Sequence, residues 1–116
     1  MNRNTDGIAA ERVAAIFLQK QGLELLEANY RCRFGEIDLV LRDGDTLVFA
    51  EVRLRTSGNF GGAAASITAK KREKLLRAAR HYLASSKNTP RCRFDAVLLS
   101  GVSKQEIEWI KNAFGE

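Results

Sequence analysis

The segment Gly35–Arg55, GEIDLVLRDGDTLVFAEVRLR, decides the fold of this 116-residue chain. Large apolar and β-branched residues fill Ile37–Arg42 and Thr46–Leu54, and residues 43–45, Asp-Gly-Asp, separate the two runs. Such runs on either side of an Asp-Gly turn are typical of two antiparallel strands joined as a β-hairpin. The sequence therefore predicts a hairpin at the centre of the fold.

The same hairpin carries acidic residues where strands that only built a core would carry valine or isoleucine. Side chains alternate across a strand, so Glu36 and Asp38 share one face of the first strand. A loop of two or four residues would place Asp38 opposite Phe49 or Glu51, whereas a three-residue loop would place the acids on opposite faces. In the first case Asp38 and Glu51 lie within reach of one ion, with Glu36 close by.

Glu51 is the acid whose position needs an explanation. Both alternating sets of side chains in the second strand are apolar as far as Ala50, which predicts a central strand buried on two faces. A dehydrated carboxylate at the end of such a strand is costly unless a cation or hydrogen bonds compensate. Either Glu51 reaches solvent or pairs with Arg53 or Arg55, or it binds Mg²⁺ or Mn²⁺ together with Asp38, since such ions prefer carboxylate oxygens.

Two helices are predicted on either side of the hairpin in the sequence. The first begins at a cap, Thr5-Asp6, and runs to about Gln21, where Gly22 ends it. Its apolar stripe consists of Ala9, Val13, Ile16 and Phe17. The second runs from Thr68 to about Ser86 and stops at residues 88–90, Asn-Thr-Pro. Its apolar face consists of Leu75, Leu76, Ala79, Tyr82 and Leu83.

The remaining segments complete an α/β pattern. Leu23–Tyr30 predicts a short strand, Thr56–Gly62 a loop, and Phe94–Leu99 a strand buried on both faces. The tail, Ser103–Glu116, fits a helix or an edge strand equally well. A strand after the second helix implies a crossover and one parallel pair. The expected fold is therefore α/β, with a mixed central sheet flanked by helices.

Length and composition favour one ordinary domain spanning residues 1–116. No window approaches the roughly 18 consecutive apolar residues that a membrane span requires, and the first residues lack the pattern of a secretory signal. We therefore expect a cytoplasmic protein with no membrane partner. Cys32 and Cys92 cannot furnish a structural zinc site with the single histidine, so buried thiols are expected.

Positive charge is concentrated in the second predicted helix. The net charge is +5, and the isoelectric point is near 9.6. Residues 66–88 contain the single acid Glu73 against Lys70, Lys71, Arg72, Lys74, Arg77, Arg80 and Lys87. A solvated helix face is the ordinary explanation of such a run. The basicity of the whole chain and the arginines around the hairpin favour a nucleic-acid partner instead.

The hairpin motif also resembles that of a known family. Gly-Glu-Ile-Asp-Leu-Val, a turn, then Val-Phe-Ala-Glu-Val-Arg-Leu-Arg is similar to the YraN-like uncharacterised protein family, whose members resemble restriction-endonuclease-fold proteins related to Holliday-junction resolvases. The resemblance runs through most of the chain. It includes Gly7-x-x-x-Glu11-Arg12, Asn29-Tyr30-Arg31, Lys71-Arg72 and Arg93-Phe94-Asp95.

The resemblance implies an αβββαβ restriction-endonuclease-like core and a metal site. Asp38 and the acid of Glu51-x-Arg53 take the positions of the metal-binding carboxylates in the nuclease motif D…(D/E)xK, and Glu11 approaches from the first helix. Glu36 would assist as a further metal ligand. The implied chemistry is Mg²⁺- or Mn²⁺-dependent hydrolysis of phosphodiester bonds. Arg53 departs from the motif, because arginine stays charged and is a poor proton acceptor where lysine can lose a proton.

Together these observations predict a protein that binds nucleic acid, DNA above all, and acts as a metal-dependent nuclease on structured or branched substrates. The expected catalytic residues are Asp38, Glu51, Arg53 and Glu11. The residues expected to follow the phosphate backbone are Arg31, Arg33, Arg55, Lys70, Lys71, Arg72 and Lys74. Resolvase-like enzymes act as dimers on symmetric junctions, so the resemblance also implies a homodimer. The alternatives are a non-catalytic nucleic-acid-binding module, in which Arg53 marks a lost activity, and a basic protein-interaction adaptor.

Overall fold

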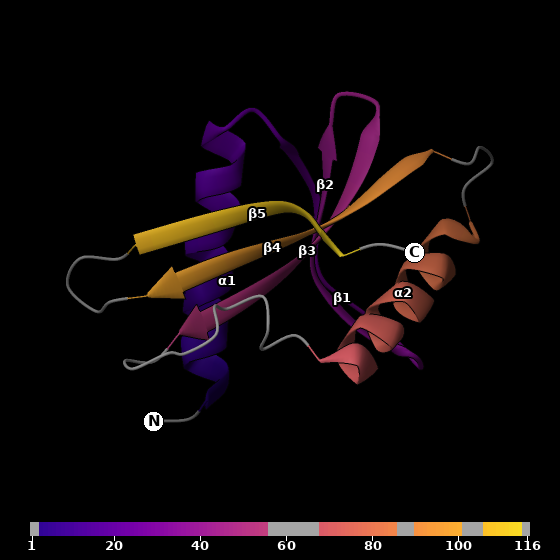
Figure 1. Ribbon diagram of the computed structural model, residues 1–116, viewed down its shortest axis with the longest axis horizontal. Helices are drawn as coiled ribbons and strands as arrows, with labels where there is room; N and C mark the ends of the chain where they lie inside the picture. Colours follow the sequence, from indigo (N-terminus) through magenta and orange to yellow (C-terminus); the bar gives the residue numbers. More distant parts are fainter. Residues whose placement is uncertain (1–2, 56–67, 86–89, 101–105, 115–116) are drawn as a thin grey trace.

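The computed structural model describes residues 3–55, 68–85, 90–100 and 106–114 (Figure 1). Within them the chain forms α1 (Arg3–Lys20), β1 (Glu24–Cys32), β2 (Gly35–Asp43), β3 (Thr46–Arg55), α2 (Ala69–Leu83), β4 (Arg91–Ser100) and β5 (Glu106–Phe114). The predicted loop at 56–62 lies outside these ranges. No helix in them is both long and apolar enough to cross a membrane.

All five of these strands form one mixed sheet, in the spatial order β1-β2-β3-β4-β5. β3 and β4 are parallel, because the chain crosses a face of the sheet through α2 between them, and the other neighbours are antiparallel. The predicted α/β class, central hairpin and crossover are confirmed, and the order αβββαβ is followed by β5. Residues 106–114 of the ambiguous tail form an edge strand, since β5 pairs with β4 at the end of the sheet.

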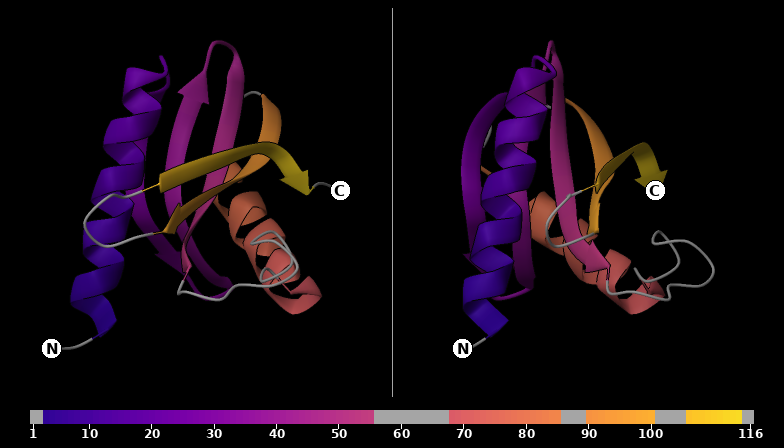
Figure 2. Two further views of the ribbon diagram at one scale, coloured as in Figure 1. Left: turned by 60° about the vertical axis from the view of Figure 1, so that its left-hand side comes forward. Right: turned by 90° about the vertical axis from the view of Figure 1, so that its left-hand side faces the viewer.

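α1 and α2 cover opposite faces of the sheet (Figure 2). Leu39 and Val48 belong to the apolar cluster that packs against α1, whereas their neighbours Val40 and Phe49 belong to the cluster that packs against α2. This alternation follows from the two-residue repeat of a strand. β3 is therefore buried on both faces, as its apolar sequence predicted.

α1 packs through a stripe that only partly matches the predicted one. Ala10, Ala14 and Leu18 are buried against the sheet and the predicted Val13 and Phe17 pack beside them, whereas Ile16 is 54% exposed. Small alanines let the helix axis approach the sheet, so placing Ile16 in the stripe was wrong. The cap was also misplaced, because residues 5 and 6 lie inside the helix. Gly22 does end it, with φ +102° and with the amide of residue 23 donating to the carbonyl of Leu18 at 3.1 Å.

α2 follows its prediction closely. Thr68 is its N-cap, and the Thr68 hydroxyl accepts a hydrogen bond from the backbone N–H of Lys71 at 3.2 Å. Leu75, Ala78 and Ala79 are its buried residues, and Leu83 is its last. The cysteines were predicted less well. Cys32 is half-buried but Cys92 is exposed, because the buried part of β4 begins only at residue 94.

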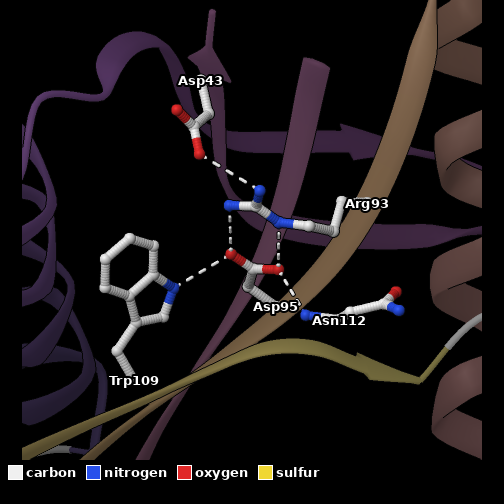
Figure 3. A network of polar contacts seen from close by, with 5 residues as sticks. All are labelled: Asp43, Arg93, Asp95, Trp109 and Asn112. Carbon is white, nitrogen blue, oxygen red and sulfur yellow. Dashed lines mark hydrogen bonds and ion pairs between the residues drawn. The ribbon is translucent and has the colours of Figure 1, made fainter.

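Asp95 in β4 holds the last strand in place (Figure 3). Its carboxylate is completely buried. It accepts two hydrogen bonds from the guanidinium of Arg93, at 2.9 and 3.0 Å. On the β5 side it accepts one from Trp109 Nε1 and one from the backbone N–H of Asn112, each at 2.9 Å. Arg93 also donates to Asp43 at 3.1 Å, so one network ties β5 and the β2–β3 turn to β4.

Removing this carboxylate should destabilise the protein strongly. We expect Asp95→Ala to lower the free energy of unfolding by roughly 3–5 kcal/mol, because Arg93, Trp109 and Asn112 lose their acceptor in the interior. Urea unfolding followed by circular dichroism measures this. Glu24→Ala, which removes an exposed ion pair with Arg42, serves as the control and should cost less than about 1 kcal/mol. Equal losses in the two variants would show that the Asp95 network is not what holds β5.

Candidate metal centre and nucleic-acid interface

The sheet divides into two branches beside the candidate site. β2 and β3 pair from Asp43 and Thr46 as far as Leu39 and Ala50. Beyond that point β2 continues to pair with β1, and β3 continues to pair with β4. Figure 1 shows the two pairs of strands diverging below the hairpin. We call the point of divergence the fork, and it exposes backbone groups that an unbroken sheet would pair.

The turn places Asp38 and Glu51 opposite each other at the fork. Asp43 and Thr46 are partners, so the connecting loop has two residues, and Gly44 adopts φ +64°. Continued beyond the last pair, this register sets Asp38 against Glu51. The backbone N–H of Val52 donates to Asp38 Oδ2 at 2.8 Å, in place of a ladder bond between the strands. Of the two loop cases that the sequence left open, the even one is therefore observed.

A cluster of carboxylates forms at the fork. Side-chain oxygens of Glu11, Glu36 and Asp38 lie within 4.8 Å of one another, and we call these three residues the acidic cluster. Glu11 comes from α1, on the other side of the sheet from α2, and its Oε1 is buried without a hydrogen bond to any described residue. Glu51 borders the same site from β3. It lines a cavity of about 170 Å³ together with Glu36, Asp38, Lys71, Lys74 and Leu75.

The electrostatics of these acids favour the binding of a cation. Burial raises the pKa of Asp38 from 3.8 to about 8, and the charges of Glu51, Glu11 and Glu36 act in the same direction, while the Val52 N–H opposes them. Burial also raises the pKa of Glu51, against the charges of Arg53 and Lys71. Without added positive charge, the Asp38 carboxyl therefore holds its proton at a pH where exposed acids have lost theirs.

A hard divalent ion fits the donor set. Ligand oxygens on opposite sides of an octahedral Mg²⁺ are about 4.2 Å apart, since each Mg–O distance is about 2.1 Å. Carboxylate oxygens within 4.8 Å of one another need only small side-chain rotations to reach such spacing. Glu11 Oε1 accepts no hydrogen bond from any described residue, so this oxygen is available to coordinate the ion. The acidic cluster thus contains Asp38 and Glu36 of the predicted ligands, and Glu51 lies beside it.

The predicted cationic residues divide between the cavity and the surface. Lys71 and Lys74 line the acidic cavity, and Arg53 Nε lies 3.8 Å from Glu51 Oε2. Arg31 is exposed and pairs with Glu36 at 3.5 Å. Of the others, Lys70 and Arg72 are exposed in the first turn of α2, Arg33 lies in the β1–β2 turn, and the side chain of Arg55 is outside the described part of the chain. The structure therefore brings Lys71, Lys74 and Arg53 to the acids.

The chain matches the model of Uncharacterised protein family UPF0102, the YraN family, over residues 10–99. The chain belongs to this family. A UPF0102 protein of Nitrosomonas europaea is 64% identical over 110 residues, which cover 95% of this chain and 93% of that protein. Others are a UPF0102 protein of Nitrosospira multiformis, 60% identical over 98% of this chain and 96% of the relative, and one of Psychromonas ingrahamii, 50% identical over 97% and 92%.

The raised pKa of Asp38 gives the metal-free UPF0102 protein a distinctive pH dependence. Between pH 3.8 and about 8 the folded state holds a proton on Asp38 that the unfolded state has lost. Stability therefore declines as the pH rises through this window. We expect Asp38→Asn, which can still accept from Val52, to flatten the decline and to be more stable than wild type at pH 8. Urea unfolding at several pH values in EDTA measures this, and parallel curves for the two proteins would contradict it.

Proposed function

We propose that this UPF0102 protein binds structured or branched DNA in the cytoplasm and hydrolyses its phosphodiester bonds with Mg²⁺ or Mn²⁺ held by the acidic cluster. The observation that carries the proposal is the convergence of Glu11, Glu36 and Asp38 oxygens within 4.8 Å, at a cavity whose other wall carries lysines. Carboxylates facing lysines are the arrangement expected where a cation and a phosphate meet.

The first turn of α2 supports the phosphate part of the proposal. It contains Lys70, Lys71 and Arg72 and no acid, with Thr68 as the N-cap. Cations at a helix N-terminus oppose the helix dipole, so this composition costs stability in the isolated protein. A bound phosphate reverses the effect, because the dipole and the lysines then both attract it. Lys71, which also borders the acidic cavity, would hold that phosphate next to the carboxylates.

The residues of the site would have different roles in hydrolysis. A divalent cation supplies Lewis acidity and lowers the pKa of a water molecule. Asp38, Glu36 and Glu11 would hold the ion, and Glu51 would orient Arg53 through their ion pair. The guanidinium of Arg53 would neutralise charge on the phosphate in the transition state, but it is unsuited to accept a proton from water.

Arg53 also favours a second candidate, a nucleic-acid-binding module without catalysis. Its Nε is 3.8 Å from Glu51 Oε2, and both side chains are largely buried, 25% and 18% exposed. A permanent positive charge at this distance partly neutralises Glu51 and so weakens its attraction for a metal ion. In this alternative the same surface binds DNA and the acids no longer support hydrolysis.

A cleavage assay separates the two candidates. Wild type with Mg²⁺ or Mn²⁺ should cleave DNA junctions, DNA forks or single-stranded DNA. Asp38→Asn should lower the rate at least about 100-fold because it weakens the binding of the ion, and Glu51→Ala should do the same because Arg53 loses the partner that orients it. Arg53→Lys restores the lysine of the nuclease motif and so tests whether arginine at this position prevents cleavage. Glu24→Gln removes an exposed acid remote from the cavity and should leave the rate unchanged. Cleavage by Arg53→Lys alone would establish the non-catalytic module as the natural state.

Binding should depend on salt in a way that identifies the phosphate contacts. Each lysine that neutralises a phosphate contributes about 0.9 to the slope of log K against log salt on duplex DNA. We therefore expect Lys71→Ala and Lys74→Ala each to weaken binding and to lower the slope by about 1. Fluorescence anisotropy measures this, with Lys20→Ala, at the far end of α1, as the control of equal charge. Binding that is absent at low salt, or that ignores salt, would support a protein-interaction adaptor instead.

A further inference from the structure

A second cavity lies next to the acidic one and has a different character. It has a volume of about 260 Å³ and lies between α2 and the β1–β2 turn. It is lined by Arg33, Phe34, Lys70, Glu73, Lys74 and Arg77. Lys74 lines both cavities, so the two adjoin. The second cavity contains an aromatic ring and no cluster of acids, so its chemistry differs from that of the candidate metal site.

Phe34 is held in this cavity by a series of ring contacts that begins in the core. Buried Phe49 lies 5.9 Å from Tyr82, and Tyr82 lies 5.0 Å from Tyr30, as measured between ring centroids. The Tyr30 hydroxyl and His81 Nδ1 are 2.5 Å apart, which fixes the histidine ring. His81 in turn lies 5.9 Å from Phe34 in an edge-to-face arrangement. A half-buried ring supported in this way is preorganised, and it lines the cavity.

The charges around Phe34 are those of a site for an anion with an apolar part. Glu73, the only acid among the described residues of the lining, already pairs with Arg77 at 3.1 Å on the exposed side of α2. The Arg33 guanidinium carbon lies 4.9 Å from the centre of the Phe34 ring. Lys70 and Lys74 complete the wall. An aromatic ring beside several cations is the combination that proteins use to bind nucleotides outside a duplex, by stacking on the base and pairing with the phosphate.

We propose that Phe34 and the cations around it form a subsite for an unpaired nucleotide, whose base packs against the Phe34 ring while Lys70 or Lys74 binds its phosphate. The subsite rests on the proposed function, because the nucleotide would lie beside the phosphate held at the acidic cavity, through the shared Lys74. The ring lies in a cavity lined by side chains, where the paired bases of a duplex cannot present their faces. The preferred substrate would therefore be DNA with a single-stranded segment at the site.

Three labelled probes test the subsite with the full-length protein in EDTA: a blunt duplex, the same duplex with a single-stranded extension, and the same duplex with an abasic extension. Fluorescence anisotropy should show wild type binding the base-containing extension roughly 5- to 100-fold more tightly than the other two, the range that stacking of a base supplies. The abasic probe carries the same phosphates, so it separates stacking from charge.

Phe34→Ala and Phe34→Leu should lose this preference and bind all three probes alike, whereas Phe34→Trp should keep it. Ile16→Ala, on the exposed face of α1, removes a similar apolar surface elsewhere and should behave as wild type. If wild type binds the base-containing and abasic extensions equally, or if Phe34→Leu keeps the preference, the subsite is wrong although the proposed function stands. If wild type binds none of the probes in a salt-sensitive way, the proposed function itself fails.

Discussion

The hydrogen bond from the Val52 amide to Asp38 Oδ2 is the interaction on which the candidate site depends. At the fork, the β2–β3 ladder stops, and backbone groups near the sheet interior lose their partners. An unpaired buried amide is costly, so a side chain that accepts from it stabilises the divergence of the strands. Asp38 therefore has two roles: it accepts the hydrogen bond of the Val52 amide at the fork, and it belongs to the acidic cluster.

The buried Asp95 and the half-buried Asp38 show how the surroundings of a carboxylate distinguish a structural residue from a candidate ligand. Asp95 accepts four hydrogen bonds from Arg93, Trp109 and Asn112, so its charge is balanced within the protein. Asp38 accepts one from Val52 and has the carboxylates of Glu11, Glu36 and Glu51 around it. The first arrangement is complete without any ligand. In the second, the carboxylates repel one another and a cation would relieve the repulsion, which is why the fork, and not the Asp95 network, is the site to test.

Much of the fold could be predicted from sequence, because it depends on local signals. The Asp-Gly turn, the apolar runs on either side of it and the N-cap at Thr68 act over a few residues. The sequence could not decide whether Asp38 and Glu51 lie on the same face of the hairpin, since the residues Asp-Gly-Asp are compatible with loops of two, three or four residues. The α1 stripe was predicted only in part. Val13 and Phe17 pack against the core, but burial against the sheet favoured alanines such as Ala10 and Ala14 over the larger Ile16.

The parts of the site that sequence patterns missed are those made by contacts between distant segments. Glu11 carries no local sign of a ligand, and only the family resemblance indicated it, because its contact with Asp38 exists only once α1 packs beside the fork. Phe34 lies in a turn and has no periodic pattern. A signal was available, since an aromatic residue between Arg33 and Gly35 is unusual for a tight turn that only connects strands.

The topology of the sheet explains why cations and acids meet. Parallel β3 and β4 require the chain to cross one face of the sheet between them, and α2 lies in that crossing, over β2. Gly35 lies where α2 approaches the β1–β2 turn. Its φ of +151° favours glycine, and a Cβ there would make an ordinary contact, 3.6 Å from Lys74 Cβ. Lys74 borders both cavities, so the position of α2 against this turn relates Phe34 to the acids. The proposed binding of an unpaired base beside a phosphate depends on that relation.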